Sequence, residues 1–250
     1  MQDKTANIRV ALVTGAAKRL GAAIADALHE AGYAVVIHFN HSKNDALKRV
    51  AAFNTRRPGS ALAVQADLCI DSDRDRLVAQ TLTWRNRLDV LVNNASSFYP
   101  TPVGNVTLEH WDDLIGTNLK APFFISQAAR SALAEARGTI VNLADINAER
   151  PCADHPIYCA AKAGLVMLTK ALARDLAPDI KVNAVAPGVI LWPEAQTDAQ
   201  REERAAVPAR IPMGQLGRPH NVAQAVLFFC QPENYVTGQV LAVDGGLSQT

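Results

Sequence analysis

The fold is decided by the stretch Ile8-Arg-Val-Ala-Leu-Val-Thr14-Gly15-Ala-Ala-Lys18-Arg19-Leu20-Gly21. Its first half is short, apolar and β-branched, which is typical of a strand buried on both faces of a sheet. Gly15 allows a tight turn after that strand, and Gly21 allows the helix expected over residues 22–31 to pack closely against it. A strand, a glycine turn and a helix form the phosphate-binding element of dinucleotide folds, because backbone amides and the helix dipole receive the pyrophosphate.

Arg19 stands where the simple G-x-G-x-x-G form of this turn has its middle glycine. A guanidinium at this position either adds positive charge against a phosphate or reaches over a substrate. In both cases we expect the turn to bind the cofactor through Gly15, Arg19, Leu20 and Gly21.

Strand-like and helix-like stretches alternate along the rest of the chain. Strands are expected over 33–39, 61–66, 88–92, 138–143 and 180–185, and helices over 71–86, 108–137 and 158–176. This alternation predicts one α/β domain over residues 1–250, a single Rossmann-type doubly wound parallel sheet with helices on both faces. Such sheets bind ligands at the carboxyl ends of their strands, so the side chains just beyond those ends are candidate site residues: Arg19, Asn94, Asp145 and Pro187.

Length and composition fit one enzyme domain. At 250 residues the chain can bury a large core, and its formal net charge of +1 gives no electrostatic reason to expect nucleic acid or an anionic membrane as a partner. No apolar run approaches the length of a membrane span, and residues 1–9 are too short and polar for a signal peptide. The cysteines and histidines show no metal or redox-pair spacing, so a cytoplasmic protein with reduced thiols and no metal is expected.

The segment after the second expected strand indicates which nicotinamide cofactor is used. Asn40, His41 and Ser42 follow the strand, and no acid lies within residues 31–44. A site for NAD places a carboxylate here for the ribose hydroxyls, whereas a site for NADP avoids that charge and supplies donors to the phosphate. The three polar residues therefore favour NADPH. Asp67, at the end of the third strand, is placed to touch the adenine.

Tyr158 and Lys162 stand four residues apart in a stretch expected to be helical. Residues at i and i+4 share one helix face, so the phenol and the ammonium group project into the same space. A free phenol has a pKa near ~10, and a nearby cation lowers it toward the range useful for general acid–base catalysis. With Asp145 thirteen residues upstream, these side chains form the candidate catalytic group.

Five motifs together resemble the short-chain dehydrogenase/reductase superfamily, over about Arg9 to Gly246. They are Gly15-x-x-x-Arg19-x-Gly21, Asn93-Asn94-Ala95, Asn118, Tyr158-x-x-x-Lys162 and Pro187-Gly188. Within the superfamily, the chain resembles the pteridine reductase family in the segments 14–21 and 94–102 and in Asp145. Most short-chain reductases carry a serine where this chain has Asp145.

The resemblance implies a role for each candidate catalytic residue. Tyr158 is expected to donate a proton, Lys162 to bind the nicotinamide ribose and lower the tyrosine pKa, and Asn118 to support a water relay. Asp145 is expected to act with Tyr158 in delivering a proton to a pterin ring nitrogen. Further cofactor contacts are implied for Asn94, Ala95, Ser96, Tyr158, Lys162, Pro187 and Gly188.

The implied substrate is a pterin or a folate. Phe98 is expected to stack on the pterin and hold it against the nicotinamide, with Ser96 and Arg19 in contact with the pterin and the cofactor phosphates. A flat ring held in this way gains stacking energy and lies close to the hydride donor. The segment of about residues 188–212 is expected to border the substrate, where Trp192 either lines the pocket or packs beside it.

Three kinds of function remain open: pterin reduction, carbonyl reduction and cofactor binding without catalysis. The expected reaction is NADPH-dependent reduction of a dihydropterin to a tetrahydropterin, and dihydromonapterin reductases share the aspartate, which leaves the pterin side chain open. A carbonyl reductase acting on a 3-oxoacyl thioester is disfavoured because Asp145, unless it is protonated, would repel a developing oxyanion. Intact Tyr158, Lys162 and Asn118 disfavour a non-catalytic protein.

The chain departs from the family pattern at two places. Asn40-His41-Ser42 stands where the best-known pteridine reductases carry a more basic His-Arg-Ser, and apolar Ile190 stands where those enzymes have a serine. The phosphate site and the substrate pocket are therefore expected to differ from theirs. The resemblance also implies a homotetramer, formed through the long helices near residues 108–137 and 156–176.

Overall fold

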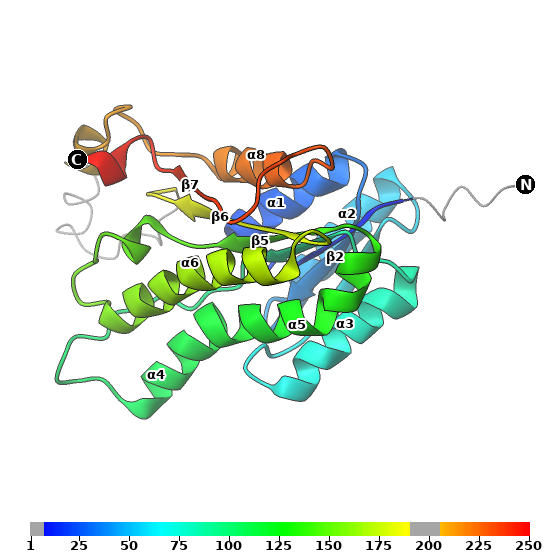
Figure 1. The fold of residues 1–250 in the computed structure, drawn as a ribbon, viewed down its shortest axis with the longest axis horizontal. Coiled ribbons are helices and arrows are strands. Elements are labelled where there is room, and N and C mark those ends of the chain that lie inside the picture. Colours follow the sequence, from blue (N-terminus) through cyan, green and yellow to red (C-terminus); the bar gives the residue numbers. More distant parts are fainter. Residues whose placement is uncertain (1–7, 191–205) are drawn as a thin grey trace, which may run out of the picture.

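The computed structural model describes residues 8–190 and 206–250. Within these ranges, seven strands form one sheet in which all neighbours run parallel, in the order β3-β2-β1-β4-β5-β6-β7 (Figure 1). The strands are β1 (Val10–Val13), β2 (Ala34–Phe39), β3 (Ala61–Gln65), β4 (Val90–Asn93), β5 (Thr139–Leu143), β6 (Lys181–Pro187) and β7 (Val240–Val243). The strand order reverses between β1 and β4, which is where a doubly wound sheet binds its ligands. The predicted fold class is confirmed.

Helices cover both faces of the sheet (Figure 1). One face carries α1 (Arg19–Glu30), α2 (Lys43–Arg56) and α8 (Pro219–Phe229), and the other carries α3 (Asp71–Arg85), α5 (Ala121–Glu135) and α6 (Pro156–Leu176). Helix α4 (Leu108–Ile115) packs against α6. The shorter helical segments are η1 (Gly116–Lys120), η2 (Ile146–Ala148), η3 (Val207–Arg210) and η4 (Leu247–Gln249).

Successive residues of the central strands point to opposite faces, and both faces exclude water. In β1, Val10 and Leu12 pack in the cluster with α3 and α5, whereas Ala11 and Val13 pack in the cluster with α1 and α8. All four are fully buried, which explains why the sequence shows a continuous apolar run instead of an alternating one. Burial of each larger side chain contributes roughly 1.5–3 kcal/mol to folding.

A polar column of three buried side chains runs from β4 through β5 to α6. Asn93 Nδ2 donates to Asn142 Oδ1 over 2.8 Å, and Asn142 Nδ2 donates to Thr169 Oγ1 over 2.9 Å. Asn93 and Asn142 are register partners in β4 and β5. Because an unpaired buried polar group costs about 1–3 kcal/mol, the polar column ties helix α6 to one alignment of the sheet.

The long helix expected over residues 108–137 is interrupted. Helix α4 ends at Ile115, the π-helical turn η1 follows, and α5 begins at Ala121. Asn118 in η1 donates through Nδ2 to the Leu114 carbonyl, its i−4 acceptor, over 2.9 Å. A side chain that occupies such a carbonyl competes with regular helix, and π turns are frequent at functional sites.

The elements expected from the sequence do not include α2, α8 and β7. Strand β7 is four residues long and partly exposed. Strand β6 also extends further than expected. Pro187 is its last residue and pairs with Val243, so this proline closes the strand instead of following it.

One of the described helices, α6, is long and apolar enough to cross a membrane by length and composition. A buried core helix of a protein that does not span a membrane can have the same length and composition. Leu165 and Ala173 of α6 are buried, and α6 packs against β6, so its apolar residues have a place in the core.

Candidate active site

A cleft of about 1580 Å³ lies at the carboxyl ends of the strands. Residues 18–21, 67–69, 94–98 and 187–190 border it. Ligand pockets commonly span roughly 300–1,000 Å³, so this cleft has room for a dinucleotide and a second molecule. The predicted site residues that line it are Gly15, Arg19, Leu20, Gly21, Asn40, His41, Ser42, Asp67, Asn94, Ala95, Ser96, Phe98, Asp145, Tyr158, Lys162, Pro187 and Gly188.

Two predicted residues are not in that lining. Asn118 is buried, with 1% of its surface exposed, and contacts residues of the cleft wall. Trp192 and most of the predicted substrate segment lie outside the described residues. Ile190, the last residue described before that gap, lines the cleft.

The turn after β1 leaves no room for side chains at its glycines. Gly15 has a φ of +62°, a left-handed conformation that glycine adopts without a Cβ clash. A Cβ added to Gly21 would lie 2.3 Å from the Gly15 carbonyl oxygen and 2.5 Å from Asn94 Nδ2. Asn94 Nδ2 donates to the Thr14 carbonyl over 2.8 Å, which joins the turn to the loop after β4. A bare backbone at a helix N-terminus fits the pyrophosphate of a dinucleotide.

His38 in β2 supports the same turn, although the sequence analysis does not identify it as a site residue. Its Nδ1 accepts the Gly15 N–H over 3.0 Å, and its Nε2 lies 3.1 Å from the Ala66 carbonyl oxygen. Burial lowers the pKa of His38 to about 4, so the ring is neutral, Nδ1 accepts and Nε2 donates. The signal in the sequence is a single histidine within the apolar strand 34–39.

The segment between β2 and α2 presents Asn40, His41 and Ser42 to the cleft. Helix α2 begins directly after them, so the positive end of its dipole lies at this segment. Asp45, in the first turn of α2, pairs with Lys18 of the glycine turn over 3.1 Å. Side-chain donors at a helix N-terminus fit a dinucleotide that carries a phosphate on its ribose.

The candidate catalytic residues meet at the end of β5. Tyr158 Oη donates to Asp145 Oδ2 over 2.7 Å, and Lys162 Nζ donates to the Leu143 carbonyl over 2.8 Å. Tyr158 and Lys162 lie one turn apart in α6, with 4% and 3% of their surface exposed. Asp145 Oδ1 accepts the Asn147 N–H over 2.8 Å, which orients the carboxylate toward the phenol.

Burial and charge shift the pKa values of this group. Burial raises the pKa of Tyr158 above its ordinary value, and the Asp145 carboxylate raises it further. Burial also raises the pKa of Asp145 and lowers the pKa of Lys162 to about 8. The tyrosine pKa is therefore raised, not lowered as expected, because the phenol is buried and contacts Asp145, while Lys162 Nζ bonds to the backbone. A protonated phenol beside a carboxyl group of raised pKa can donate protons.

Asn118 joins the π turn to the loop after β4. Its Nδ2 donates to the Ser97 carbonyl over 2.9 Å, and its Oδ1 accepts a hydrogen bond from Ser96 Oγ over 2.6 Å. Asn118 therefore holds the loop against η1. Its support of a water relay stays a prediction.

Phe98 lies beside the catalytic tyrosine. Its ring centroid is 4.7 Å from that of Tyr158, with the planes 75° apart, and 4.4 Å from that of His155, with the planes 7° apart. Half of the Phe98 side chain, 52%, remains exposed. The site thus offers a flat apolar surface next to the proton-donating pair. His155 is not among the residues predicted from the sequence.

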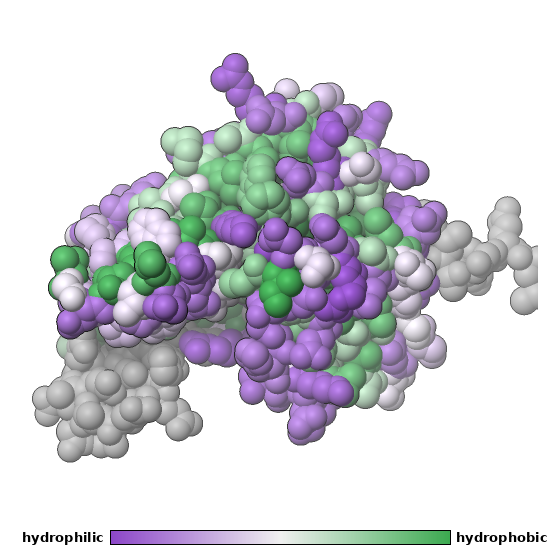
Figure 2. Space-filling model, turned by 90° about the horizontal axis from the view of Figure 1, so that it is seen from below, coloured by the Kyte–Doolittle hydropathy of each residue, from purple (hydrophilic) through white to green (hydrophobic). Residues whose placement is uncertain are grey.

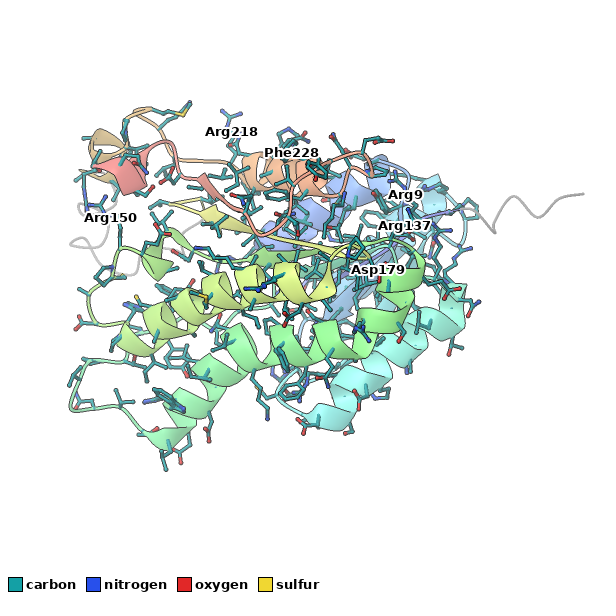
Figure 3. The ribbon with its side chains drawn as sticks, in the orientation of Figure 1. Arg9, Arg137, Arg150, Asp179, Arg218 and Phe228 are labelled. Carbon is teal, nitrogen blue, oxygen red and sulfur yellow. The ribbon has the colours of Figure 1, made fainter. Side chains whose placement is uncertain are left out.

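The C-terminal segment also reaches the cleft. Leu247 and Thr250 line it, and Arg150 Nη1 donates to the Leu247 carbonyl over 2.9 Å. Figure 3 shows Arg150 near the C-terminal end of the chain. The two bonded residues are 97 positions apart, so no local pattern in the sequence predicts this contact.

Comparison with known proteins agrees with this geometry. The family described as enoyl-(acyl carrier protein) reductase, one of the short-chain dehydrogenases/reductases, matches residues 15–248. The chain therefore belongs to the short-chain dehydrogenase/reductase superfamily. It is an oxidoreductase of that superfamily, whose members use a nicotinamide cofactor.

Individual relatives cover nearly the whole chain. It is 39% identical to pteridine reductase 1 of Leishmania tarentolae, with 96% of each chain covered. It is 35% identical to an uncharacterized oxidoreductase of Methylorubrum extorquens, with 96% of this chain and 97% of the relative covered. It is also 35% identical to 3β-hydroxysteroid dehydrogenase 1 of Eggerthella lenta, with 96% of this chain and 94% of the relative covered. Relatives with different activities are thus almost equally similar, and the substrate has to be argued from the site.

Proposed function

We propose that this protein is an NADPH-dependent pteridine reductase, which reduces dihydropterins to tetrahydropterins and accepts oxidised pterins and dihydrofolate as related substrates. The observation that carries the proposal is the 2.7 Å hydrogen bond from Tyr158 to Asp145. Phe98 supports it, because its half-exposed ring lies next to Tyr158. The 39% identity to pteridine reductase 1 supports it as well.

In this reaction the bound cofactor supplies a hydride to a ring carbon of the pterin. The chain supplies the proton for the adjacent ring nitrogen. Burial keeps the proton on Tyr158 Oη and favours the protonated form of Asp145, so the pair can hold the proton until the nitrogen takes it. Lys162, held at the Leu143 carbonyl, is positioned to bind the nicotinamide ribose.

The carboxyl group of Asp145 favours reduction of a C=N bond over reduction of a C=O bond. A ring nitrogen that receives a proton benefits from a second acidic group beside the tyrosine. A carbonyl oxygen develops negative charge, and an ionised carboxylate next to it is repulsive. Burial raises the pKa of Asp145, so the group can give up a proton and take one back closer to neutral pH than an ordinary aspartate, which suits the first task. While it is ionised, the same group opposes the second.

The cofactor preference for NADPH rests on Asn40, His41 and Ser42. These residues supply hydrogen-bond donors where an NAD site has a carboxylate. The nearest acid along the chain, Asp45, is paired with Lys18 and is half-buried. A ribose phosphate would therefore meet donors and a helix N-terminus instead of an unpaired negative charge.

The second candidate function is carbonyl reduction. It is favoured by the 35% identity to an enzyme named as a 3β-hydroxysteroid dehydrogenase. Within pterin reduction, a dihydromonapterin reductase is the nearest alternative, because the described residues do not determine which pterin side chain is preferred.

The test is NADPH oxidation by the purified protein with biopterin, dihydrobiopterin, dihydromonapterin, dihydrofolate and a 3-oxoacyl thioester. We expect turnover with the pterins and none above background with the thioester. Turnover with the thioester alone would overturn the proposal and establish carbonyl reduction. The same assay with NADH measures the cofactor preference.

Asp145→Ser tests the proton-donating pair directly. We expect this variant to lose most of its turnover with dihydrobiopterin while NADPH affinity changes by less than about twofold, since a lost general acid typically costs about 10²–10⁴-fold in rate. Glu149→Ser, at an exposed acid just after η2, is the matched control and should behave as wild type. An unchanged pterin rate in Asp145→Ser would contradict the assignment.

We also propose that the protein assembles as a homotetramer. The face that carries α4 and α5 has apolar areas between polar ones (Figure 2). Leu108 and Trp111 of α4 are 78% and 48% exposed, and Met167 of α6 is 64% exposed. Burial of such residues against a second copy of the chain lowers the free energy of the assembly. Light scattering coupled to size exclusion gives the mass, and a monomer would contradict the proposal.

A further inference from the structure

Asp113 of α4 accepts hydrogen bonds from three hydroxyl groups. Its Oδ1 accepts from Ser97 Oγ over 3.1 Å and from Thr117 Oγ1 over 3.3 Å, and its Oδ2 accepts from Tyr99 Oη over 2.9 Å. Ser97 and Tyr99 belong to the loop after β4, whereas Thr117 belongs to the π turn η1. One carboxylate therefore anchors this loop to the helical layer at two points.

The two anchored residues flank Phe98. Ser97 and Tyr99, on either side of Phe98, both donate to Asp113. The Phe98 ring between them instead lies against Tyr158 and His155. It is 4.7 Å from the Tyr158 ring, centroid to centroid. Asp113 thus influences the position of the Phe98 ring through Ser97 and Tyr99, and needs no direct contact with the ring.

We propose that Asp113 is the positioning residue that orients Phe98 for stacking on the substrate ring, and that it thereby favours flat heterocycles as substrates. This inference rests on the proposed pterin reduction. Asp113 also lines the cleft, but its three hydrogen-bond donors come from the loop and from η1, so we expect it to act through the loop.

A carboxylate suits this task better than a neutral acceptor. It has two oxygens with about four acceptor sites and no proton to place, so it can take three hydroxyl donors at once. Hydrogen bonds to an ionised acceptor are also roughly twice as strong as neutral ones. Burial and the contact with Asp113 raise the pKa of Tyr99 to about 12, so this phenol remains a donor throughout the neutral range.

A second anchor, Asn118, fixes the part of the loop that precedes Phe98. It bonds to the Ser96 hydroxyl and to the Ser97 carbonyl. Asp113 extends the attachment past Phe98 to Tyr99. Loss of Asp113 should therefore leave the catalytic pair in place and free only the aromatic ring, which predicts weaker substrate binding with nearly normal chemistry.

The experiment measures steady-state kinetics of Asp113→Ala and Asp113→Asn with NADPH and dihydrobiopterin. We expect KM for the pterin to rise about tenfold in Asp113→Ala, with kcat lowered less than about threefold and the NADPH Kd changed less than about twofold, because the loss corresponds to roughly one charge-assisted hydrogen bond. Asp113→Asn keeps one acceptor oxygen and should show an intermediate KM. Glu109→Ala, an exposed acid on the same helix, is the matched control and should match wild type.

Two outcomes of the kinetics would overturn the inference. One is an unchanged KM in Asp113→Ala. The other is a parallel fall of kcat, pterin affinity and NADPH affinity, which would show a general structural role. Should Asp113→Ala fail to fold, Tyr99→Phe and Ser97→Ala each remove one donor, and KM should rise about two- to fivefold in each.

A second measurement separates this inference from the proposed function. Hydrogen exchange followed by mass spectrometry reports the order of the peptide 96–102 without any substrate. We expect faster exchange of this peptide in Asp113→Ala than in Glu109→Ala, whatever the wild type reduces. Equal exchange would overturn the anchoring. A wild type that reduces only the thioester would overturn pterin reduction, and faster exchange in Asp113→Ala would then still support the anchoring.

Discussion

Two neighbouring parts of the cleft, the glycine turn after β1 and the Asp145–Tyr158 pair beside β5, keep their shape by different means. The turn depends on missing side chains, because a Cβ on Gly21 would lie 2.3 Å from a backbone oxygen. The pair depends on side chains from two separate segments, which meet over 2.7 Å once α6 has packed on the sheet. The nearest atom to a Cβ on Gly21 belongs to Gly15 of the same turn and the next to Asn94 of the loop after β4, whereas the hydrogen bond needs α6 to be packed beside the end of β5.

This difference predicts that substitutions in the two parts have different effects on cofactor binding and on turnover. Substitutions in the glycine turn should weaken cofactor binding first. Substitutions in the pair should reduce turnover while the cofactor still binds.

Tyr158→Phe should lower kcat by about 10²–10⁴-fold, since the only atom removed is the proton donor. The NADPH Kd, measured by fluorescence titration, should change less than about twofold. Tyr235→Phe removes a fully exposed hydroxyl and is the matched control. Turnover of Tyr158→Phe at the wild-type rate would exclude this residue as the proton donor.

Gly21→Ala should weaken NADPH binding about tenfold or more and destabilise the fold by about 1–3 kcal/mol, as overpacking commonly does. The reason is that the new Cβ meets backbone, which cannot move aside. Gly164→Ala is the matched control, because its Cβ would meet only the end of the Leu119 side chain, at 2.9 Å. Cofactor titration and thermal unfolding of both variants check this prediction. Equal effects in the two variants would contradict it.

His41→Asp should reduce the preference for NADPH over NADH by about five- to tenfold, because a carboxylate near the surface repels the ribose phosphate by about 1 kcal/mol or more. Asn44→Asp places the same charge further into α2 and should leave the preference within about twofold. The preference is measured as the ratio of kcat/KM with NADPH to kcat/KM with NADH. A ratio that falls equally in both variants would mean that His41 has no special place in the phosphate site.

Asp145→Asn should stabilise the protein while it lowers turnover. Burial raises the folded-state pKa of Asp145, so its favourable contribution is present at low pH and is lost as the pH rises through that pKa. The variant should therefore gain about 2–4 °C in Tm at pH 8, as expected for ~1 kcal/mol in a chain of this size, and less at pH 4. The same gain at both pH values would show that the charge of Asp145 is not the cause.

The same contrast explains how much could be predicted from the sequence. The turn with Gly15 and Gly21 and the i, i+4 pair of Tyr158 and Lys162 follow from local spacing, and the structure places all four at the cleft. The parallel sheet follows from the alternation of apolar runs. The place of Asp145 just beyond a strand end predicts that it lies at the cleft, but its role beside Tyr158 could be assigned only by resemblance, because nothing in the local pattern shows that it faces Tyr158.

The parts that could not be predicted depend on contacts between distant residues. The stacking of Phe98 on His155 joins two loops, and Asp113 bonds to residues 14 and 16 positions before it. The direction of the tyrosine pKa was missed for the same reason. It depends on burial and on the contact with Asp145, neither of which is visible in the spacing of Tyr158 and Lys162.

The polar column described above also bears on how faithfully the chain assembles. Central strands that are apolar on both faces can slip past one another by a residue and still bury apolar side chains, so hydrophobicity specifies their alignment poorly. Asn93 donates to Asn142 in one alignment, and a slip would break this buried hydrogen bond, at a cost of about 1–3 kcal/mol. Misaligned sheets are thereby disfavoured during folding, and Thr169 extends that discrimination to the helix that brings Tyr158 to Asp145.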